Sequence, residues 1–239
     1  MRAAIVSDIH GNLTAFEAVL ADLRQASPDL ILHGGDLAGP GSRPVAVVDR
    51  IRDLGWQGVL GNTDEMLPRP GTLADFAGGA PQLQAMFAAI EEMAAWMRAE
   101  LGADHLAWLD ALPMVHTEER LALVHAGPQS TWRSPTPEAA DEELTRVYSP
   151  LGRPLVVYGH VHRPFVRRIG ELTVANSGTV GQSYDGDPRA SYLLVDDGRP
   201  EIRRVEYDIE GEIALLLGGG MPHAEWVARS LRASGPVGL

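Results

Sequence analysis

Short apolar runs alternate with helix-spaced apolar positions along the first half of the chain. The run AAIVSD ends in polar residues, and LTAFEAVLADLRQ then keeps apolar residues at helical spacing up to the pair Ser27-Pro28. DLILHGGD and RPVAVVDRIRDLG repeat this order, and QGVLGN predicts a third strand. Repeated strand–helix units predict a parallel sheet covered by helices, with chemistry at the carboxyl ends of the strands.

The second half is predicted to consist mainly of strands. Turn signals such as Gly170 and Asp197-Gly198 separate its apolar runs, which are LPMVHTEE, RLALVHAG, PLVVYGH, PFVRRI, ELTVANSG, ASYLLVD and EIRRVEYD. Helices are predicted over 137–148 and 222–232. Two sheets packed face to face, with helices outside them, would accommodate this number of strands.

Residues 66–110 are predicted to form a helical insertion within a single domain that spans residues 1–239. Residues 66–80 are rich in Pro and Gly, and an apolar helical face follows, made of Leu83, Met86, Phe87, Ile90, Met93, Ala94 and Met97. We expect this face to pack against the sheet; a mobile lid or a dimer contact is the alternative. A chain of 239 residues suits one hydrophobic core.

Composition excludes several classes of protein. Apolar residues make up 45% of the chain and charged residues 22%, as in ordinary globular proteins. The net charge of −12 and the absence of a basic run argue against a nucleic-acid partner. No apolar stretch approaches the roughly 18 residues of a membrane helix, and no signal-peptide pattern precedes RAAIVSD, so we expect a cytoplasmic protein without a membrane partner.

Side chains that bind metals end five of the apolar runs, namely AAIVSDIH, LILHGGD, GVLGN, LALVHAG and LVVYGHVH. These residues are Asp8, His10, Asp36, Asn62, His125, His160 and His162. The chain has no cysteine, so metal ligands must be His, carboxylate or amide groups. Each motif alone is weak, since Gly-Asp and Gly-Asn are also turn signals. Their joint occurrence at strand ends, where a rigid scaffold holds loop residues, indicates one compact metal site.

The ordered set SDIHGN, GGD, GN, H and GHVH resembles the calcineurin-like metallophosphoesterase family. SDIHGNLTAFEAVL and DGDPRASY resemble its compact bacterial and archaeal branch. The resemblance implies an α/β fold, a four-layer α/β/β/α sandwich with a small helical insertion. It also implies two divalent metal ions per chain, with Mn²⁺ the first expectation and Fe²⁺, Zn²⁺, Co²⁺ or Ni²⁺ compatible with the same ligands.

The resemblance also implies a role for each ligand. Asp8, His10 and His162 would hold the first ion, and Asn62, His125 and His160 the second. Asp36 would bridge the two, because a carboxylate has two oxygens. The implied activity is hydrolysis of phosphodiester or phosphoanhydride bonds in a small, nucleotide-like substrate by a metal-bridging hydroxide, with Asp36 and Asn62 as catalytic ligands.

One position departs from the family pattern. Many members carry a histidine after the Asn of the third motif, where it protonates the leaving group, but GNTD has Thr63 there. A threonine hydroxyl is too weak an acid for this role. His33, three residues before Asp36, is the candidate substitute, and His105, His116 and His223 are expected to be structural.

Candidate substrate contacts are Thr63, Thr179 and Arg189, while Gly178 and Gly181 are expected to form a turn. A second hypothesis is a non-catalytic scaffold for protein binding, which the missing acid favours. The complete set of ligand types argues against it, since a cluster of charges is costly without metal. The sequence leaves the substrate, the native metal and the oligomeric state open.

Overall fold

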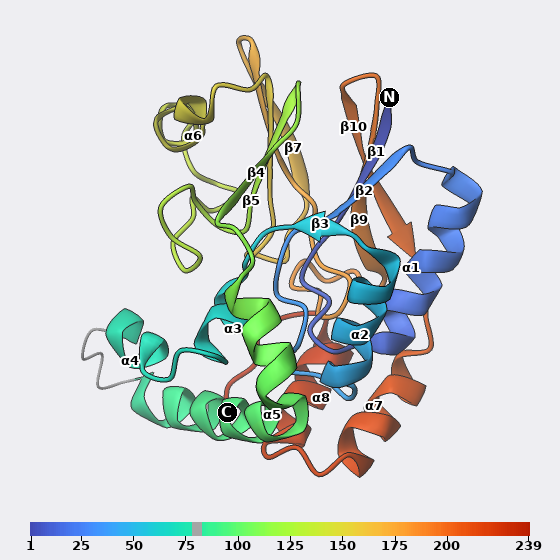
Figure 1. Cartoon of the computed structure of the whole chain (residues 1–239), viewed down its shortest axis with the longest axis vertical. Helices are drawn as coiled ribbons and strands as arrows, with labels where there is room; N and C mark the ends of the chain where they lie inside the picture. The colour runs from blue at the N-terminus through green and yellow to red at the C-terminus, as the bar shows by residue number, and fades with distance from the viewer. Residues whose placement is uncertain (78–82) are drawn as a thin grey trace.

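Two five-stranded sheets pack face to face in the computed structural model, which describes residues 1–77 and 83–239 (Figure 1). The first sheet has the order β10-β9-β1-β2-β3. Its strands are β1 (Arg2–Val6), β2 (Leu30–His33), β3 (Gln57–Gly58), β9 (Ala190–Asp196) and β10 (Arg199–Val205). β1, β2 and β3 are parallel, as the strand–helix alternation predicts, and β9 pairs antiparallel with β1.

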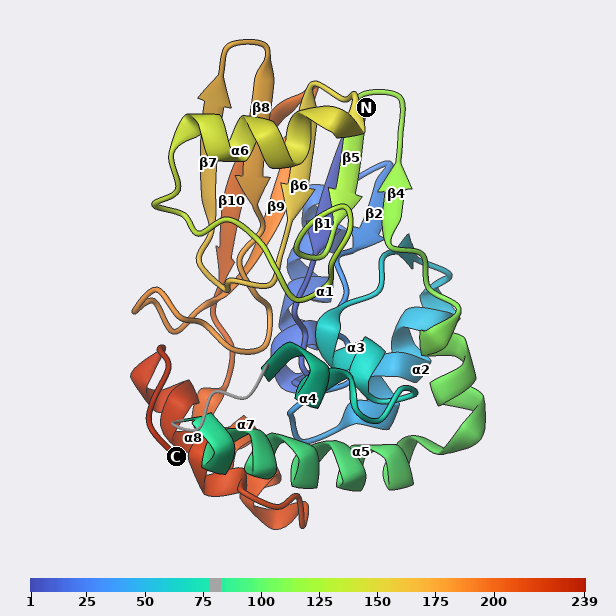
Figure 2. The ribbon, with the colours of Figure 1, turned by 90° about the vertical axis from the view of Figure 1, so that its left-hand side faces the viewer.

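The second sheet has the order β4-β5-β6-β8-β7. Its strands are β4 (Val115–Thr117), β5 (Leu121–Val124), β6 (Leu155–Tyr158), β7 (Phe165–Ile169) and β8 (Leu172–Asn176). β5, β6 and β8 are parallel, so their carboxyl ends share one edge. Figure 2 shows this sheet above the helices α3, α4 and α5, with β5 and β8 running toward them.

Alternating side chains of β1 fill two different cores. Ala3 and Ile5 pack against residues of the second sheet such as Leu123, whereas Ala4 and Val6 belong to the core shared with α1. On the outer face of the second sheet, α6 (Asp141–Tyr148) buries Leu144 and its final tyrosine. The predicted four-layer α/β/β/α sandwich is therefore confirmed.

Two helices cover the outer face of the first sheet, α1 (Leu13–Ala26) and α2 (Pro44–Leu54). The side chain of Asn12 caps α1 by accepting a hydrogen bond from the backbone N–H of Ala15 at 2.9 Å. Pro44 begins α2, a position that suits its fixed φ. Both helices thus begin directly after the loops that leave β1 and β2.

Further helices lie below the sheets: α3 (Asn62–Met66), α4 (Thr72–Ala77) and α5 (Gln84–Asp110), which is interrupted at Gly102. Of the predicted insertion 66–110, residues 78–82 lie outside the described part. α5 makes its main contacts with α2, α3 and α4. The apolar face of α5, which the sequence predicts to pack against the sheet, therefore packs against other helices. α1 and α2 already cover the outer face of the first sheet.

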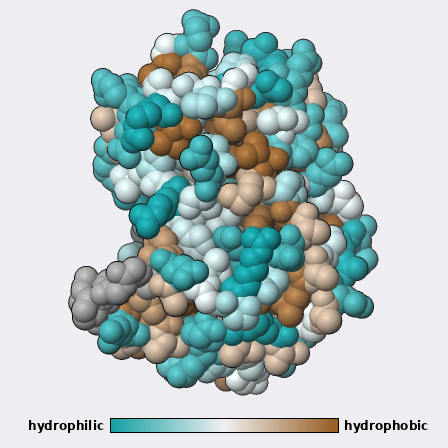
Figure 3. All heavy atoms as spheres, turned by 60° about the vertical axis from the view of Figure 1, so that its left-hand side comes forward, coloured by the Kyte–Doolittle hydropathy of each residue, from teal (hydrophilic) through white to brown (hydrophobic). Residues whose placement is uncertain are grey.

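Two helices follow the last strand. α8 (Ala224–Ala233) agrees with the prediction for 222–232, but the sequence reading omitted α7 (Ile209–Gly218), whose first turn is capped by Asp208. The helix predicted over 137–148 begins only at Asp141, and a 3₁₀ turn over Ser149–Leu151 follows it. No helix among the described residues is long and apolar enough to cross a membrane. Figure 3 shows hydrophobic atoms at the surface among hydrophilic ones on one face of the molecule.

Candidate metal centre

All seven predicted ligands gather where strands end. Six come from loops that follow β1, β2, β5 and β6, and the seventh, Asn62, begins α3. Their side chains form two groups, and Asp36 lies between them. Residues far apart in the chain meet here because the two sheets present the ends of their parallel strands at the same edge.

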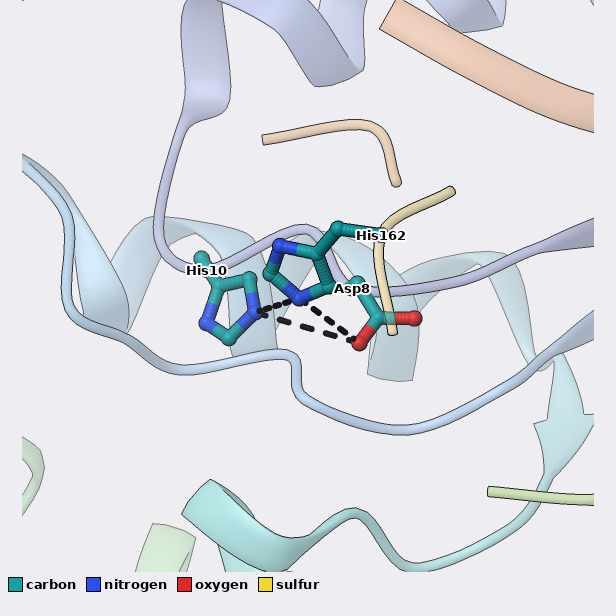
Figure 4. Close-up of side chains that lie close together, drawn as sticks. All are labelled: Asp8, His10 and His162. Carbon is teal, nitrogen blue, oxygen red and sulfur yellow. Dashed lines mark hydrogen bonds and ion pairs between the residues drawn. The ribbon is translucent and has the colours of Figure 1, made fainter. Parts of the chain in front are cut away.

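The first group consists of Asp8, His10 and His162 (Figure 4). The Nε2 atom of His162 lies 3.2 Å from Oδ1 of Asp8 and 3.0 Å from Nε2 of His10. The Nε2 atom of His10 lies 3.9 Å from the same carboxylate oxygen. Three potential ligand atoms therefore converge on one point.

The second group surrounds the side-chain oxygen of Asn62. Oδ1 of Asn62 lies 2.9 Å from Nε2 of His125 and 2.8 Å from Nδ1 of His160. His160 thus belongs to this group, while His162, two residues later, belongs to the first. The two histidines of GHVH therefore lie in different groups, His160 beside Asn62 and His162 beside Asp8.

Asp36 contacts both groups through different oxygens. Its Oδ2 lies 3.6 Å from Nε2 of His10, and its Oδ1 lies 3.5 Å from Nε2 of His125. The backbone N–H of Thr63 donates to Oδ1 at 2.9 Å and fixes the carboxylate. Asp36 therefore lies between the two groups of side chains, with one oxygen toward each.

Backbone carbonyls orient three of the histidine rings. The Nδ1 atoms of His10, His125 and His162 lie 2.5, 2.8 and 2.6 Å from the carbonyl oxygens of Gly39, Gly34 and Gln182. A carbonyl can only accept a hydrogen bond, so Nδ1 carries the proton and a neutral ring turns the lone pair of Nε2 inward. In His10 and His162 these lone pairs face each other. This donor set fits a divalent cation, which would replace repulsion between lone pairs with coordination.

Charges and burial shift the pKa values of these groups in different directions. Burial raises the pKa of Asp8, but His162, His125 and His10 outweigh it in their protonated forms and leave the pKa below its ordinary value. Burial and His162 lower the pKa of His10. Burial and His125 lower the pKa of His160 to about 4. Burial lowers the pKa of His125, but Asp36 and Asp8 outweigh burial and raise it.

The backbone at the centre adopts the left-handed region at five of the seven candidate ligands. Asp8, His10, Asp36, His160 and His162 have φ values of 56°, 51°, 53°, 67° and 55°. Such values are rare for residues other than glycine. They turn each strand end sharply, so that residues two apart in the chain reach the centre.

Two glycines of the motifs are required by close approach. A Cβ at Gly61 would lie 2.1 Å from Oδ1 of Asp36, and a Cβ at Gly159 would lie 2.3 Å from Oδ2 of Asp8. These contacts are too short for any side chain. The glycine before Asn62 in GN and the glycine before His160 in GHVH are therefore required by the close approach of these carboxylates.

Asp64 is a residue of the site that the sequence analysis missed. Its fully buried carboxylate accepts hydrogen bonds from the backbone N–H groups of Leu37 at 2.9 Å and Ala38 at 3.2 Å, and so supports the loop that carries Asp36. Burial and the charge of Asp36 raise the pKa of Asp64 to about 7. Its place in GNTD, two residues after Asn62, was the available signal.

A cavity of about 310 Å³ opens onto both groups. Its floor contains side chains of the candidate centre and Thr63, whose buried hydroxyl has no hydrogen-bond partner. Its remaining lining comes mainly from α3, α4, α5, α8 and the C-terminal tail. A substrate bound at the candidate centre would therefore contact mainly these helices and the tail, which carry few of the motifs found in the sequence.

Two other predicted substrate contacts lie elsewhere. The hydroxyl of Thr179 donates to the carbonyl oxygen of Asp8 at 2.7 Å and accepts from the backbone N–H of Gln182 at 3.0 Å, so it holds the loop. The exposed Arg189 pairs with Asp187 at 2.7 Å. Neither residue lines the cavity. Gly178 has a φ of 73°, which suits the expected turn.

The remaining histidines lie outside the centre. His33 is buried on the helix side of the first sheet, its ring centre 6.3 Å from that of Trp108, and neither ring nitrogen has a hydrogen-bond partner. It does not line the cavity, so the structure does not support it as a substitute acid. The other three pair with carboxylates: His105 with Asp49, His116 with Glu118 and His223 with Glu92.

Comparisons with known proteins point to the same chemistry. A family model described as a calcineurin-like phosphoesterase superfamily domain matches residues 1–198. The uncharacterized protein MJ0912 of Methanocaldococcus jannaschii is 31% identical over 251 residues, which cover 95% of this chain and 96% of that protein. Phosphodiesterase YfcE of Escherichia coli is 25% identical over 207 residues, or 82% of this chain and 88% of that protein.

A similar solved structure is that of a metallophosphoesterase from Sphaerobacter thermophilus. It has a TM-score of 0.79 and 28% sequence identity, and the match covers 98% of this chain and 100% of that chain. The likeness therefore extends over both sheets and the helices below them.

Proposed function

The chain belongs to the calcineurin-like phosphoesterase superfamily, and from this premise we propose that it binds two divalent metal ions and hydrolyses phosphodiester or phosphoanhydride bonds in a small substrate. One observation carries the proposal: the two oxygens of Asp36 face two separate groups of ligand atoms. Asp8, His10 and His162 would hold one ion. Asn62, His125 and His160 would hold the other.

When bound, the ions would lower the pKa of a water molecule and neutralise charge on the phosphoryl oxygens. The residues of the chain prepare the site for this. Backbone carbonyls hold the rings of His10, His125 and His162, and the N–H of Thr63 holds Asp36. A rigid arrangement of this kind reduces the reorganisation that the reaction requires.

Thr63 stands where many family members carry the histidine that protonates the leaving group. Thr63 lines the cavity next to Asn62, and its hydroxyl can donate a hydrogen bond but cannot act as an acid near neutral pH. The reaction should therefore favour leaving groups that are stable as anions. This expectation favours aryl phosphodiesters and phosphoanhydrides over alkyl monoesters.

Metal reconstitution tests the proposal. Metal-stripped protein should bind two equivalents of Mn²⁺, Fe²⁺, Zn²⁺, Co²⁺ or Ni²⁺ by elemental analysis, and Mn²⁺ is the first to test. The reconstituted protein should hydrolyse bis(4-nitrophenyl) phosphate, and stripped protein should not. Binding of at most one equivalent at saturating activity would contradict the binuclear mechanism. Two bound ions without hydrolysis of any phosphate ester would favour the scaffold hypothesis.

A further inference from the structure

The lining of the cavity beyond the candidate ligands is mainly apolar, although Gln182, Tyr184 and Ser230 also contribute to it. It includes Met66 of α3, Met86, Met93 and Met97 of α5, Trp132 from the loop after β5, and Trp226 of α8. Methionine side chains are flexible and make favourable contacts with aromatic rings. Such a wall suits a bulky organic group without charge.

Positive side chains are kept away from this wall. Within residues 1–77 and 83–239, neither Arg nor Lys lines the cavity. Two arginines flank it and are engaged elsewhere. The guanidinium of Arg98 donates to the carbonyl oxygen of Met66 at 3.3 Å and pairs with Glu91, and that of Arg133 lies 5.4 Å from the ring centre of Phe76. An anion in the cavity would thus find positive charge only at the metal centre.

The charge at that centre limits the substrate. Two divalent ions bound there would carry about four positive charges, and the carboxylates of Asp8 and Asp36 would neutralise about two of them. The remaining charge would balance a hydroxide and one monoanionic phosphoryl group. A nucleoside triphosphate carries about four negative charges, and those beyond the first would enter an apolar cavity unpaired, which is costly.

We propose that the cavity binds the apolar substituent of a monoanionic phosphodiester and selects such diesters over nucleotide polyphosphates. The inference rests on the proposed function and narrows it. Met93 and Met97 lie in the wall, and His10 and His162 lie in the floor of the same cavity. A diester anchored at the centre can therefore place its organic group among the methionines and tryptophans.

Three 4-nitrophenyl esters test the selection, namely those of methyl phosphate, phenyl phosphate and the γ-phosphate of adenosine triphosphate. The two diesters release 4-nitrophenolate, so the leaving group does not vary between them. The γ-phosphorus of the triphosphate ester can expel either 4-nitrophenolate or adenosine diphosphate, so both products are measured for that ester. We expect kcat/KM for the phenyl diester to exceed that for the methyl diester about 10- to 100-fold, because the ring leaves water. The triphosphate ester should be the poorest substrate. A phenyl-to-methyl ratio near one, or a preference for the triphosphate ester, would overturn the inference.

A binding measurement separates this inference from the proposed function. Isothermal titration of metal-loaded protein should show diphenyl phosphate binding about 10-fold or more tightly than dimethyl phosphate. If none of the esters is hydrolysed but diphenyl phosphate binds selectively, the proposed function fails and the cavity assignment stands. If all are hydrolysed at equal rates and the two phosphates bind equally, only the cavity assignment fails.

Variants of Met86 test whether the preference for an apolar substituent arises in the cavity. Met86→Arg adds a cation to the wall, so it should weaken diphenyl phosphate binding about 10-fold or more and improve the relative kcat/KM for the triphosphate ester. Met86→Leu keeps the wall apolar and should retain the preference for the phenyl diester. Met86→Gln provides a neutral polar variant if the arginine lowers metal content or stability. Unchanged selectivity in folded, metal-loaded Met86→Arg and Met86→Gln would contradict the assignment.

Discussion

The Nε2 atoms of His10 and His162 face each other at 3.0 Å, while the Nδ1 atom of each ring donates to a backbone carbonyl. Neither neutral ring has a proton left to place between them. Oδ1 of Asp8 lies 3.2 Å from the same nitrogen of His162, which adds a further electron pair. These groups would repel one another, and a bound cation would relieve that repulsion.

Metal binding should raise the melting temperature. At a hundred times the dissociation constant, a ligand stabilises the folded state by about 2.7 kcal/mol, which corresponds to roughly 5–10 °C for a chain of this size. Differential scanning fluorimetry of metal-free protein with added Mn²⁺ measures the shift. His162→Gln should lose most of it. His223→Gln removes a histidine that pairs with Glu92 outside the centre, and should keep it. A melting curve unmoved by millimolar Mn²⁺ would contradict the assigned ligands.

Asp36→Asn should be the most damaging single change at the centre. The amide has the shape of the carboxylate but lacks its charge, so two cations would be held near each other with less compensation. We expect bound metal to fall from two equivalents toward one, and kcat/KM to fall on the order of 100-fold or more. The matched control is Asp49→Asn, which changes an exposed carboxylate paired with His105. Near-normal metal content in Asp36→Asn would show that another group bridges the ions.

The clustering of the seven candidate ligands was predictable because their positions follow from local rules. Each stands directly after a short apolar run, and the ends of parallel strands meet at one edge whatever the loops contain. Asp64 was not predictable in the same way. Its carboxylate accepts from the backbone N–H groups of Leu37 and Ala38, a long-range contact without a sequence period.

The cavity wall and α7 escaped prediction for related reasons. The apolar face of α5 has the right spacing for a helix on a sheet, but the partner of an amphipathic face depends on which surfaces are already covered. α7 contains Gly211 and ends at Gly218, and these glycines weakened the helical pattern that Asp208 begins. Arg189 carries the charge expected of a phosphate contact, yet Asp187 lies close enough to engage it.

Thr63→His should change the preference for leaving groups. The new imidazole would stand at the cavity floor, where it can donate a proton to a departing oxygen. It should increase kcat/KM for an alkyl ester more than for an aryl ester, by on the order of 10- to 100-fold in the ratio. Thr63→Ser is the control. Wild-type hydrolysis of alkyl monoesters as fast as aryl diesters would mean that another acid serves the site.

Asp64→Leu should loosen the loop that carries Asp36. The backbone N–H groups of Leu37 and Ala38 would lose their acceptor, at about 1–3 kcal/mol for each buried group left unpaired. We expect a lower denaturation midpoint in urea and roughly 10- to 100-fold weaker metal binding, as for other groups that support ligands. Asp64→Asn keeps the Oδ1 acceptor and should retain most of both. Equal behaviour of the two variants would contradict a role through hydrogen bonding.

Because of His33, the free energy of unfolding should decrease as the pH falls. Burial lowers its pKa to about 3 from the ordinary value of 6.5, with a smaller effect from the charge of His116. The unfolded chain takes up this proton near pH 6.5 and the folded protein does so only near pH 3. The contribution of neutral His33 to the free energy of unfolding is therefore fully present above pH 6.5. It is lost by roughly 1.4 kcal/mol per pH unit as the pH falls from 6.5 toward 3.

Urea denaturation of metal-free His33→Leu and wild type between pH 7 and pH 4.5 measures this loss. The leucine variant should lose less stability across that range, and should be at least as stable as wild type at pH 4.5, because it also removes two unpaired ring nitrogens. The partly exposed His223, which pairs with Glu92, serves as the control in the variant His223→Gln. Parallel curves for wild type and His33→Leu would contradict the shifted pKa.

Five candidate ligands have a left-handed backbone, namely Asp8, His10, Asp36, His160 and His162. Selection for stability and selection for activity should therefore favour different residues at these positions. A side chain in this region costs up to about 1–2 kcal/mol that glycine would not cost, and the cost is smaller for aspartate and asparagine. A library of variants selected only for the thermal stability of the metal-free protein should therefore accumulate Gly and Asn at these five positions. A library selected for phosphoesterase activity should keep Asp and His there, and the contrast would locate the strained residues without any further structure.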